Sequence, residues 1–283
     1  MQPKRYWQSR EGLLVLPALL FFLAIYLYPL VKLFYLSFFD PDLTFKHYAA
    51  LTAEPTHLIA LSNTLEISGW VTLTSLLLGY PLAYLMVTES KRNRAILMAL
   101  VMIPFWTSIL VRTFAWIVIL GRNGLINGLL MDMGLTARPL QMIHNMMGVQ
   151  IGMLHVLLPF MVFPLYGVMS RIDMGLVLAA RSLGASPKRA FIRVFLPLSL
   201  PGVTAGCVLV FLLSVGFYIT PALLGGPGEI TLATLIEMQI SDLLNWGFGA
   251  TLSVALLVVI GLIFVVFSWV MGLDRLTGSG SKS

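Results

Sequence analysis

Few residues in this 283-residue chain are of a type that does acid–base, nucleophilic or metal chemistry, and their spacing does not suit it. The four histidines show none of the short spacings that metal ligands adopt: they are His47, His57, His144 and His155. The single cysteine, Cys207, lies in an apolar run, where a small buried hydrophobic residue is expected. No phosphate-binding loop of the pattern G-x-x-x-x-G-K-[ST] occurs. The sequence therefore predicts neither a metal site nor a nucleotide site on this chain.

The composition explains why catalytic groups are scarce. Hydrophobic residues make up 58% of the chain and charged residues 11%, with a mean hydropathy of +0.91. A soluble domain averages about 45–50% apolar and about 25% charged residues. These values exclude a soluble enzyme, a nucleic-acid-binding protein and a disordered chain. The net charge of +6 then indicates basic residues kept on one side of a membrane.

A membrane-spanning helix needs roughly 20 residues, and five of six apolar stretches are long enough as they stand. The third is long enough only if its helix continues through Arg112, and the first is read as uncleaved. We predict an all-α membrane protein with a cytoplasmic N-terminus (1–11), one transmembrane domain (12–273) and a flexible cytoplasmic tail (274–283). The predicted spanning helices are 12–37, 64–88, 95–120, 143–170, 197–222 and 247–272.

The distribution of basic residues orients these helices. Thirteen Lys and Arg residues lie in the termini and in the loops after the second and fourth spans, whereas the opposite loops hold three: Lys46, Arg122 and Arg138. Basic residues accumulate on the cytoplasmic side of a membrane. We therefore predict that both termini are cytoplasmic.

The longest charged cytoplasmic loop, residues 171–197, carries the local signals of two short helices and a sharp turn. Asp173 can cap a first helix that runs to about Leu183, and Gly184 then stands where a helix needs positive φ. Ser186 and Pro187 suit the start of a second helix, which Pro197 is expected to end. These signals alone describe no more than a capped helical loop.

The residues of this loop resemble the EAA loop of ABC-importer permeases. Leu178-Ala179-Ala180, three residues, Gly184, nine residues and Val194-Phe195-Leu196-Pro197 fit that spacing throughout. Leu178 stands where glutamate is usual, and Val194 replaces isoleucine. Other stretches resemble the spermidine/putrescine-type permeases, among them Pro104–Ser108, Pro201–Cys207 and Asn245–Ala250, so that the likeness extends from about residue 12 to 272.

The resemblance implies a type I ABC importer permease (MetI-like) fold in a bacterial inner membrane. It also implies that the loop is a coupling helix that docks on a cytoplasmic ATPase, which would hold the ATP and Mg; this chain is expected to bind no cofactor. The expected partners are a second homologous permease, two ATPase subunits, an extracytoplasmic solute-binding protein and membrane lipids, with no nucleic acid. The expected coupling residues are Ala179, Ala180, Gly184, Ala185, Ser186, Pro187, Leu196 and Pro197.

Charged and aromatic residues near the outer ends of the spans are candidates for a substrate path. Glu66 is the only carboxylate within a predicted span; it either contacts a cation or faces interfacial water. Arg112 suits a structural pairing or a place at the pore mouth. The complete candidate set is Glu66, Trp106, Arg112, Tyr218 and Asp242.

The outer loops hold seven acidic residues against three basic ones, which favours a cationic solute. With the resemblance, this indicates a polyamine such as spermidine or putrescine. The sequence leaves open an importer of the same class for an amino acid, an opine or a phosphonate. A membrane-embedded enzyme or a secondary transporter is a distant alternative, because neither clustered catalytic groups nor a pair of mid-membrane proton sites is found.

Overall fold

The computed structural model describes residues 10–39 and 42–270, so the predictions for most of the N-terminus and for the tail 274–283 lie outside the described residues. The described residues form helices and no β-strand. The chain divides into two compact units, Met1–Glu54 with Ile236–Val258, and Pro55–Leu235 with Val259–Ser283. Six helical segments are long and apolar enough to cross a membrane, as predicted: Val15–Phe38, Pro55–Thr88, Ile109–Asp132, Met146–Met169, Pro187–Val215 and Trp246–Ser268.

The smaller unit contains α1 (Arg10–Phe38), α2 (Lys46–Ala53), the end of α12 (Leu232–Ser241) and the first half of α13 (Trp246–Val270). Its helices are joined by aromatic and hydroxyl contacts. The ring of Tyr48 stacks on Phe38 with 5.0 Å between centroids, and its hydroxyl is 2.8 Å from the Ser37 hydroxyl. The Thr251 hydroxyl donates to the Ser37 carbonyl at 3.4 Å. These contacts fix the C-terminal end of α1 to α2 and α13.

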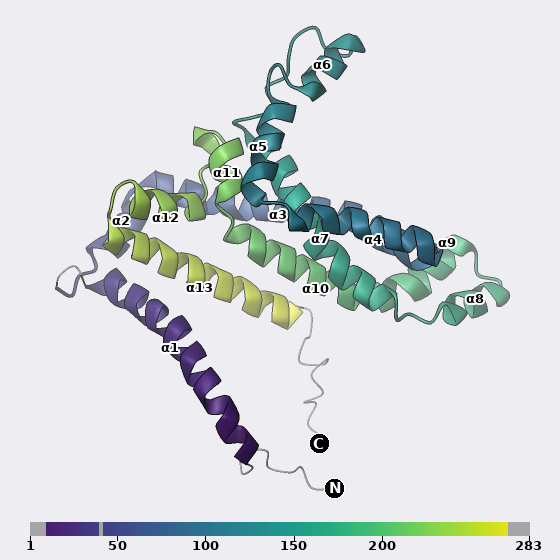
Figure 1. The fold of residues 1–283 in the computed structure, drawn as a ribbon, viewed down its shortest axis with the longest axis horizontal. Coiled ribbons are helices and arrows are strands. Elements are labelled where there is room, and N and C mark those ends of the chain that lie inside the picture. Colours follow the sequence, from purple (N-terminus) through teal and green to yellow (C-terminus); the bar gives the residue numbers. More distant parts are fainter. Residues whose placement is uncertain (1–9, 40–41, 271–283) are drawn as a thin grey trace. The chain divides into compact units, whose positions relative to one another are not determined.

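The larger unit holds the remaining helices, and its core is the packing of three of them, α3, α7 and α10 (Figure 1). Its elements are α3 (Pro55–Thr88), α4 (Lys91–Trp106), α5 (Ile109–Leu120), α6 (Leu125–Asp132), α7 (Met146–Met169), α8 (Met174–Ser182), α9 (Pro187–Ala190), a π-helical turn (Phe191–Phe195), α10 (Leu196–Val215), α11 (Ile219–Leu224), a short 3-10 helix (Pro227–Glu229), the start of α12 and the second half of α13.

Small residues let the three core helices approach one another. Met161 of α7 is fully buried, and its side chain fills the space beside two glycines. A Cβ added at Gly79 of α3 would lie 2.9 Å from Met161 Cγ, and one added at Gly206 of α10 would lie 2.7 Å from Met161 Sδ. Both distances are shorter than van der Waals contact. Close helix packing of this kind is typical of membrane proteins, where small residues let helix backbones approach and van der Waals packing stabilises their association.

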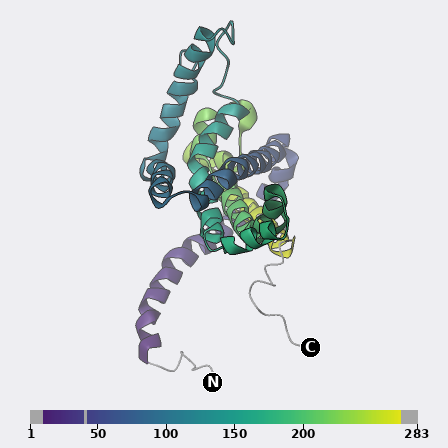
Figure 2. The same ribbon diagram turned by 90° about the vertical axis from the view of Figure 1, so that its right-hand side faces the viewer.

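The structure differs from the predicted third span, 95–120, which is two helices rather than one. Figures 1 and 2 show that α5 does not continue the direction of α4. Pro104 lies in the last turn of α4, and both the amide and the hydroxyl of Thr107 donate to its carbonyl oxygen, at 3.2 and 2.8 Å. Thr107 and Ser108 adopt extended ψ values of 147° and 137°. Ser and Thr compete with the helix for backbone hydrogen bonds, which explains the break.

Two further predicted boundaries differ. The second span was predicted to begin at residue 64, but α3 begins at Pro55, since proline is well suited to a first helical position. The fifth span was predicted to run to 222, but α10 ends at Val215 and α11 begins at Ile219. The intervening residues Gly216–Tyr218 interrupt the helix, and the amide of Phe217 donates to the Ser214 carbonyl in a tighter turn.

Candidate functional site

The loop 171–197 lies between α7 and α10, and α8 within it begins as the sequence predicts. Asp173 has extended backbone angles, and its Oδ1 accepts a 2.8 Å hydrogen bond from the Gly175 amide. This satisfies one of the amides that a helix leaves free at its start. Arg181 lies in the last turn, where a cation is favoured by the helix dipole.

Gly184 ends α8 in the conformation that only glycine adopts without strain. Its φ is +89°. The Gly184 amide donates to the Arg181 carbonyl and the Ala185 amide to the Ala180 carbonyl, both at 3.0 Å. These two bonds are the Schellman pattern. The predicted bend at Gly184 is thus confirmed, and it reverses the chain between α8 and α9.

The second helix begins as predicted but does not end as predicted. Ser186 Oγ accepts from the Arg189 amide at 3.3 Å, and Pro187 occupies the first turn of α9. Pro197 was expected to end this helix; instead the helix passes through the π-helical turn into α10. Proline lacks an amide hydrogen and its ring crowds the preceding turn. A π turn is wider, and the Leu196 amide donates to Phe191 O in its i to i−5 pattern, so the helix accommodates Pro197.

The loop presents an apolar, accessible surface. No residue of α8 is buried. Ala179 is exposed, and Ala180 and Ala185 are half-buried. The sequence analysis missed the two large apolar side chains beside them, Leu178 and Leu183, which are 59% and 89% exposed. The available sequence signal was the presence of these two leucines on either side of the small residues of a short capped helix. A basic hollow formed by Ser186, Lys188, Arg189, Ile192 and Arg193 lies on α9 and the π-helical turn.

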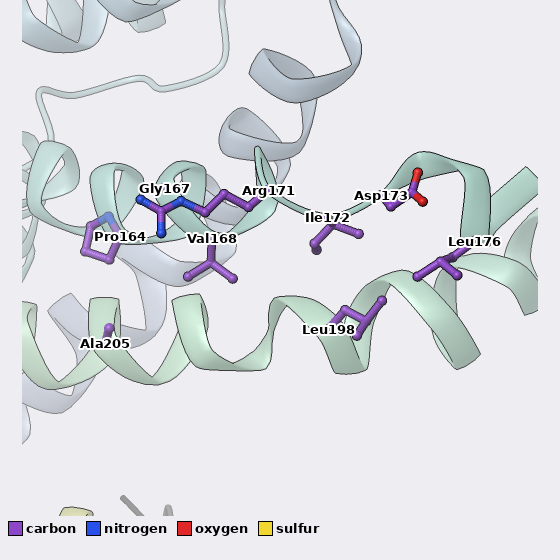
Figure 3. A pocket seen from close by; sticks show the side chains of 9 residues that line it. All are labelled: Pro164, Gly167, Val168, Arg171, Ile172, Asp173, Leu176, Leu198 and Ala205. Atoms are coloured by element: carbon purple, nitrogen blue, oxygen red, sulfur yellow. The ribbon is translucent and has the colours of Figure 1, made fainter. Parts of the chain in front are cut away.

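An open groove of about 670 Å³ lies beside this loop (Figure 3). Val168 of α7, Leu176 of α8 and Leu198 of α10 line it with apolar side chains. Arg171 and Asp173 are the charged residues of its lining, and they carry opposite charges. The groove holds no cluster of catalytic groups and suits contact with an apolar surface.

The candidate path residues of the larger unit lie on separate elements. Glu66 is exposed on α3, and Trp106, 80% exposed, ends α4. Arg112 of α5 is half-buried, and its Nε is buried without a hydrogen-bond partner. Tyr218 is 43% exposed and immediately precedes α11.

The helices of Glu66 and Trp106, α3 and α4, pack against each other, and so do the elements beside Arg112 and Tyr218. The hydroxyls of Thr113 and Thr220 are 3.5 Å apart, which links α5 to α11 and so brings the segments of Arg112 and Tyr218 together. Glu66 is on α3, outside that contact. Asp242 is exposed after α12 and belongs to the smaller unit.

A polar clamp next to Glu66 was missed by the sequence analysis. Asn63 Nδ2 donates to the carbonyls of Gly228 and Ile230 at 2.7 and 3.0 Å. Thr64 Oγ1 accepts from the Leu232 amide at 2.9 Å. These bonds join the start of α3 to a loop more than 160 residues later, and nothing in local sequence marks such a pair.

The described residues contain no group of three His, Cys, Asp or Glu side chains that could hold a metal ion. His155 of α7 instead accepts a 3.1 Å hydrogen bond at Nδ1 from the Trp116 indole. His155 is thus a packed, hydrogen-bonded side chain, and this bond links α5 to α7.

The fold and the loop define a class: an all-helical chain with six helices that could span a membrane and an exposed, capped loop before the fifth. The alginate ABC transporter bound to a periplasmic protein contains a chain that matches this one with a TM-score of 0.82, 21% identity, and coverage of 98% of this chain and 100% of that chain. The MetNI methionine ABC transporter matches with a TM-score of 0.59 and 17% identity over 82% of this chain and 100% of that one.

Residues 75–277 match the family of binding-protein-dependent transport system inner membrane components, and the chain belongs to that family. It is 37% identical over 231 residues to the spermidine/putrescine permease PotB of Haemophilus influenzae, which covers 82% of this chain and 80% of that protein. PotB of Escherichia coli K12 is 35% identical over the same length, covering 82% and 84%. The chain is therefore a permease subunit of an ABC importer and not an enzyme.

Proposed function

We propose that this permease imports a polyamine, spermidine or putrescine, along a path formed with a second, homologous permease. The observation that carries the proposal is the 35–37% identity to spermidine/putrescine permeases over 82% of the chain. The excess of acidic over basic residues in the predicted outer loops supports it, since each amine of a polyamine is protonated near neutral pH.

Loop 171–197 is the proposed coupling element, which docks on one of two cytoplasmic ATPase subunits. Its exposed Leu183 and Leu178 are suited to an apolar groove of the partner, and Ala179 allows close approach. The bend at Gly184 presents α8 away from the core. The proposed coupling residues are those predicted: Ala179, Ala180, Gly184, Ala185, Ser186, Pro187, Leu196 and Pro197. Placing this loop and both termini in the cytoplasm follows from the distribution of basic residues.

A solute-binding protein on the outer side is the proposed donor of the polyamine. We assign the path to Glu66, Trp106, Arg112, Tyr218 and Asp242. The carboxylates attract the ammonium groups, and the aromatic faces bind them by cation–π contact. Arg112 repels a cation, so we propose that it pairs with another side chain for structural reasons or stands at the pore mouth. ATP and Mg belong to the ATPase subunits, and none binds this chain.

Co-purification and reconstitution test this function. The chain, tagged, is expressed with its candidate second permease, ATPase and binding protein, and the complex is weighed by native mass spectrometry. We expect one copy of each permease and two ATPases. In proteoliposomes, binding protein loaded with spermidine or putrescine should stimulate ATP hydrolysis and labelled uptake. A functional monomer without ATPase contradicts the assembly, and stimulation only by an amino acid, opine or phosphonate contradicts the polyamine assignment.

A further inference from the structure

The π-helical turn Phe191–Phe195 is the place where the coupling loop enters the helical core. Both α8 and α9 pack against this turn. Phe195 is 1% exposed, whereas no residue of α8 is buried. The rings of Phe191 and Phe195 stack, with centroids 5.7 Å apart and planes at 17°. A π turn inside a helix is uncommon and often marks a functional position.

Tyr84, near the end of α3, contacts both of these rings. Its ring is edge-on to Phe191 at 5.4 Å and 86°, and to Phe195 at 5.0 Å and 83°. Edge-to-face pairs are directional, because the positive ring edge faces the negative π surface. The ring of Tyr84 therefore contacts both phenylalanines at once. A shift of the π-helical turn must displace the Tyr84 ring or break these contacts.

A second contact, one turn earlier on α3, keeps the two helices aligned. The Tyr80 ring is edge-on to Phe191 at 6.3 Å and 88°. Its hydroxyl is 2.8 Å from Ser199 Oγ, which itself donates to the Leu196 carbonyl at 2.8 Å. Because the Ser199 proton is engaged there, Tyr80 is the donor to Ser199. This bond resists sliding of α3 along α10. Movement of the π-helical turn toward or away from α3 then acts on α3 through the aromatic contacts.

We propose that Tyr84 is a positioning residue that passes movement of the coupling loop to α3. The proposal rests on the proposed coupling function of loop 171–197. α3 is one continuous helix of 34 residues. Glu66 lies 18 residues before Tyr84, or about 27 Å along the helix. A displacement at the π-helical turn is therefore delivered by α3 to its outer half, where Asn63 and Glu66 lie.

The test compares transport with ATP hydrolysis in the reconstituted complex. Each edge-to-face pair contributes about a two- to tenfold change in an equilibrium constant. Tyr84→Leu removes two pairs, so the number of solutes moved per ATP hydrolysed should fall about fivefold or more. Tyr84→Phe keeps the ring and should restore the ratio. A merely structural role would lower the amount of assembled complex and leave this ratio unchanged.

Tyr48→Leu is the matched control, because Tyr48 also stacks in an aromatic cluster but lies on α2 of the smaller unit. It should keep the wild-type ratio. If Tyr84→Leu does not assemble, Phe191→Leu carries the test, since Phe191 is only half-buried and should uncouple in the same way. A wild-type ratio in an assembled Tyr84→Leu or Phe191→Leu complex overturns the inference. A wild-type complex whose ATP hydrolysis ignores the binding protein contradicts the proposed function instead.

Discussion

Gly184 offers a sharp test of the proposed coupling loop, because its substitution acts through backbone strain alone. A Cβ built at this position meets no atom within 4 Å. The φ of +89° nevertheless disfavours every L side chain. The left-handed region costs such a residue about 1–2 kcal/mol. That free energy corresponds to about a 5- to 30-fold loss of the bent loop relative to the unbent one.

The proposed series is Gly184→Asn, Gly184→Ala and Gly184→Val. Asparagine tolerates positive φ better than other side chains, whereas a β-branched residue tolerates it least. Coupling should therefore decrease in that order. Gly128→Ala is the control: Gly128 lies within α6, and its added Cβ also meets no atom within 4 Å. It adds the same methyl group without the backbone strain.

The assay measures ATP hydrolysis stimulated by the loaded binding protein, together with labelled uptake in proteoliposomes at equal protein level. We expect Gly184→Val to lose both while membrane insertion is retained, and Gly128→Ala to match the wild type. Normal transport by Gly184→Val would refute the assignment of Gly184. Equal losses in all three variants would show that loss of the bend is not the cause.

Three other perturbations give separate outcomes. Glu66→Gln removes charge but keeps shape, and it should slow initial uptake about two- to fivefold with ATPase coupling intact; unchanged kinetics would assign Glu66 to interfacial water. Gly148→Ala places a Cβ 2.7 Å from the Met142 carbonyl oxygen and should lower the melting midpoint by about 2–8 °C, whereas Gly69→Ala, with open space, should not. Asn127→Ala removes three hydrogen bonds of a fully buried amide. Protease added to spheroplasts should then cleave the outer residues 121–141 more readily, whereas Asn123→Ala, at an exposed position, should leave cleavage unchanged.

Local signals predicted most of the conformation of loop 171–197. The caps at Asp173 and Ser186 and the positive φ at Gly184 all occur where the sequence indicates them. Each depends on residues within about five positions of one another, so chain neighbours suffice to specify them. The same local chemistry failed at Pro197. Its consequence depends on whether the helix before it can widen, and Phe191–Phe195 does so while packed against α3.

The third span shows a second limit of the sequence. The mainly apolar stretch 95–120 has the length of a membrane helix. Its hydropathy carries no information on whether a side chain competes with the helix for backbone hydrogen bonds. Thr107 bonds to the Pro104 carbonyl with both its amide and its hydroxyl, and the helix divides there. The Pro-x-x-Thr-Ser pattern was the available signal.

The sequence by itself determined that the chain is an all-helical membrane subunit with six apolar segments, because the need to satisfy backbone hydrogen bonds in lipid leaves an apolar segment few other choices. It also determined the helix caps and the bend of the proposed coupling loop, but not how its second helix ends. The tertiary structure alone decided which distant residues meet: Tyr84 with Phe195, and Asn63 with the carbonyl of Gly228. Such pairs depend on how the helices pack. When a helix is apolar on every side, the spacing of its apolar residues does not indicate which face packs against which neighbour.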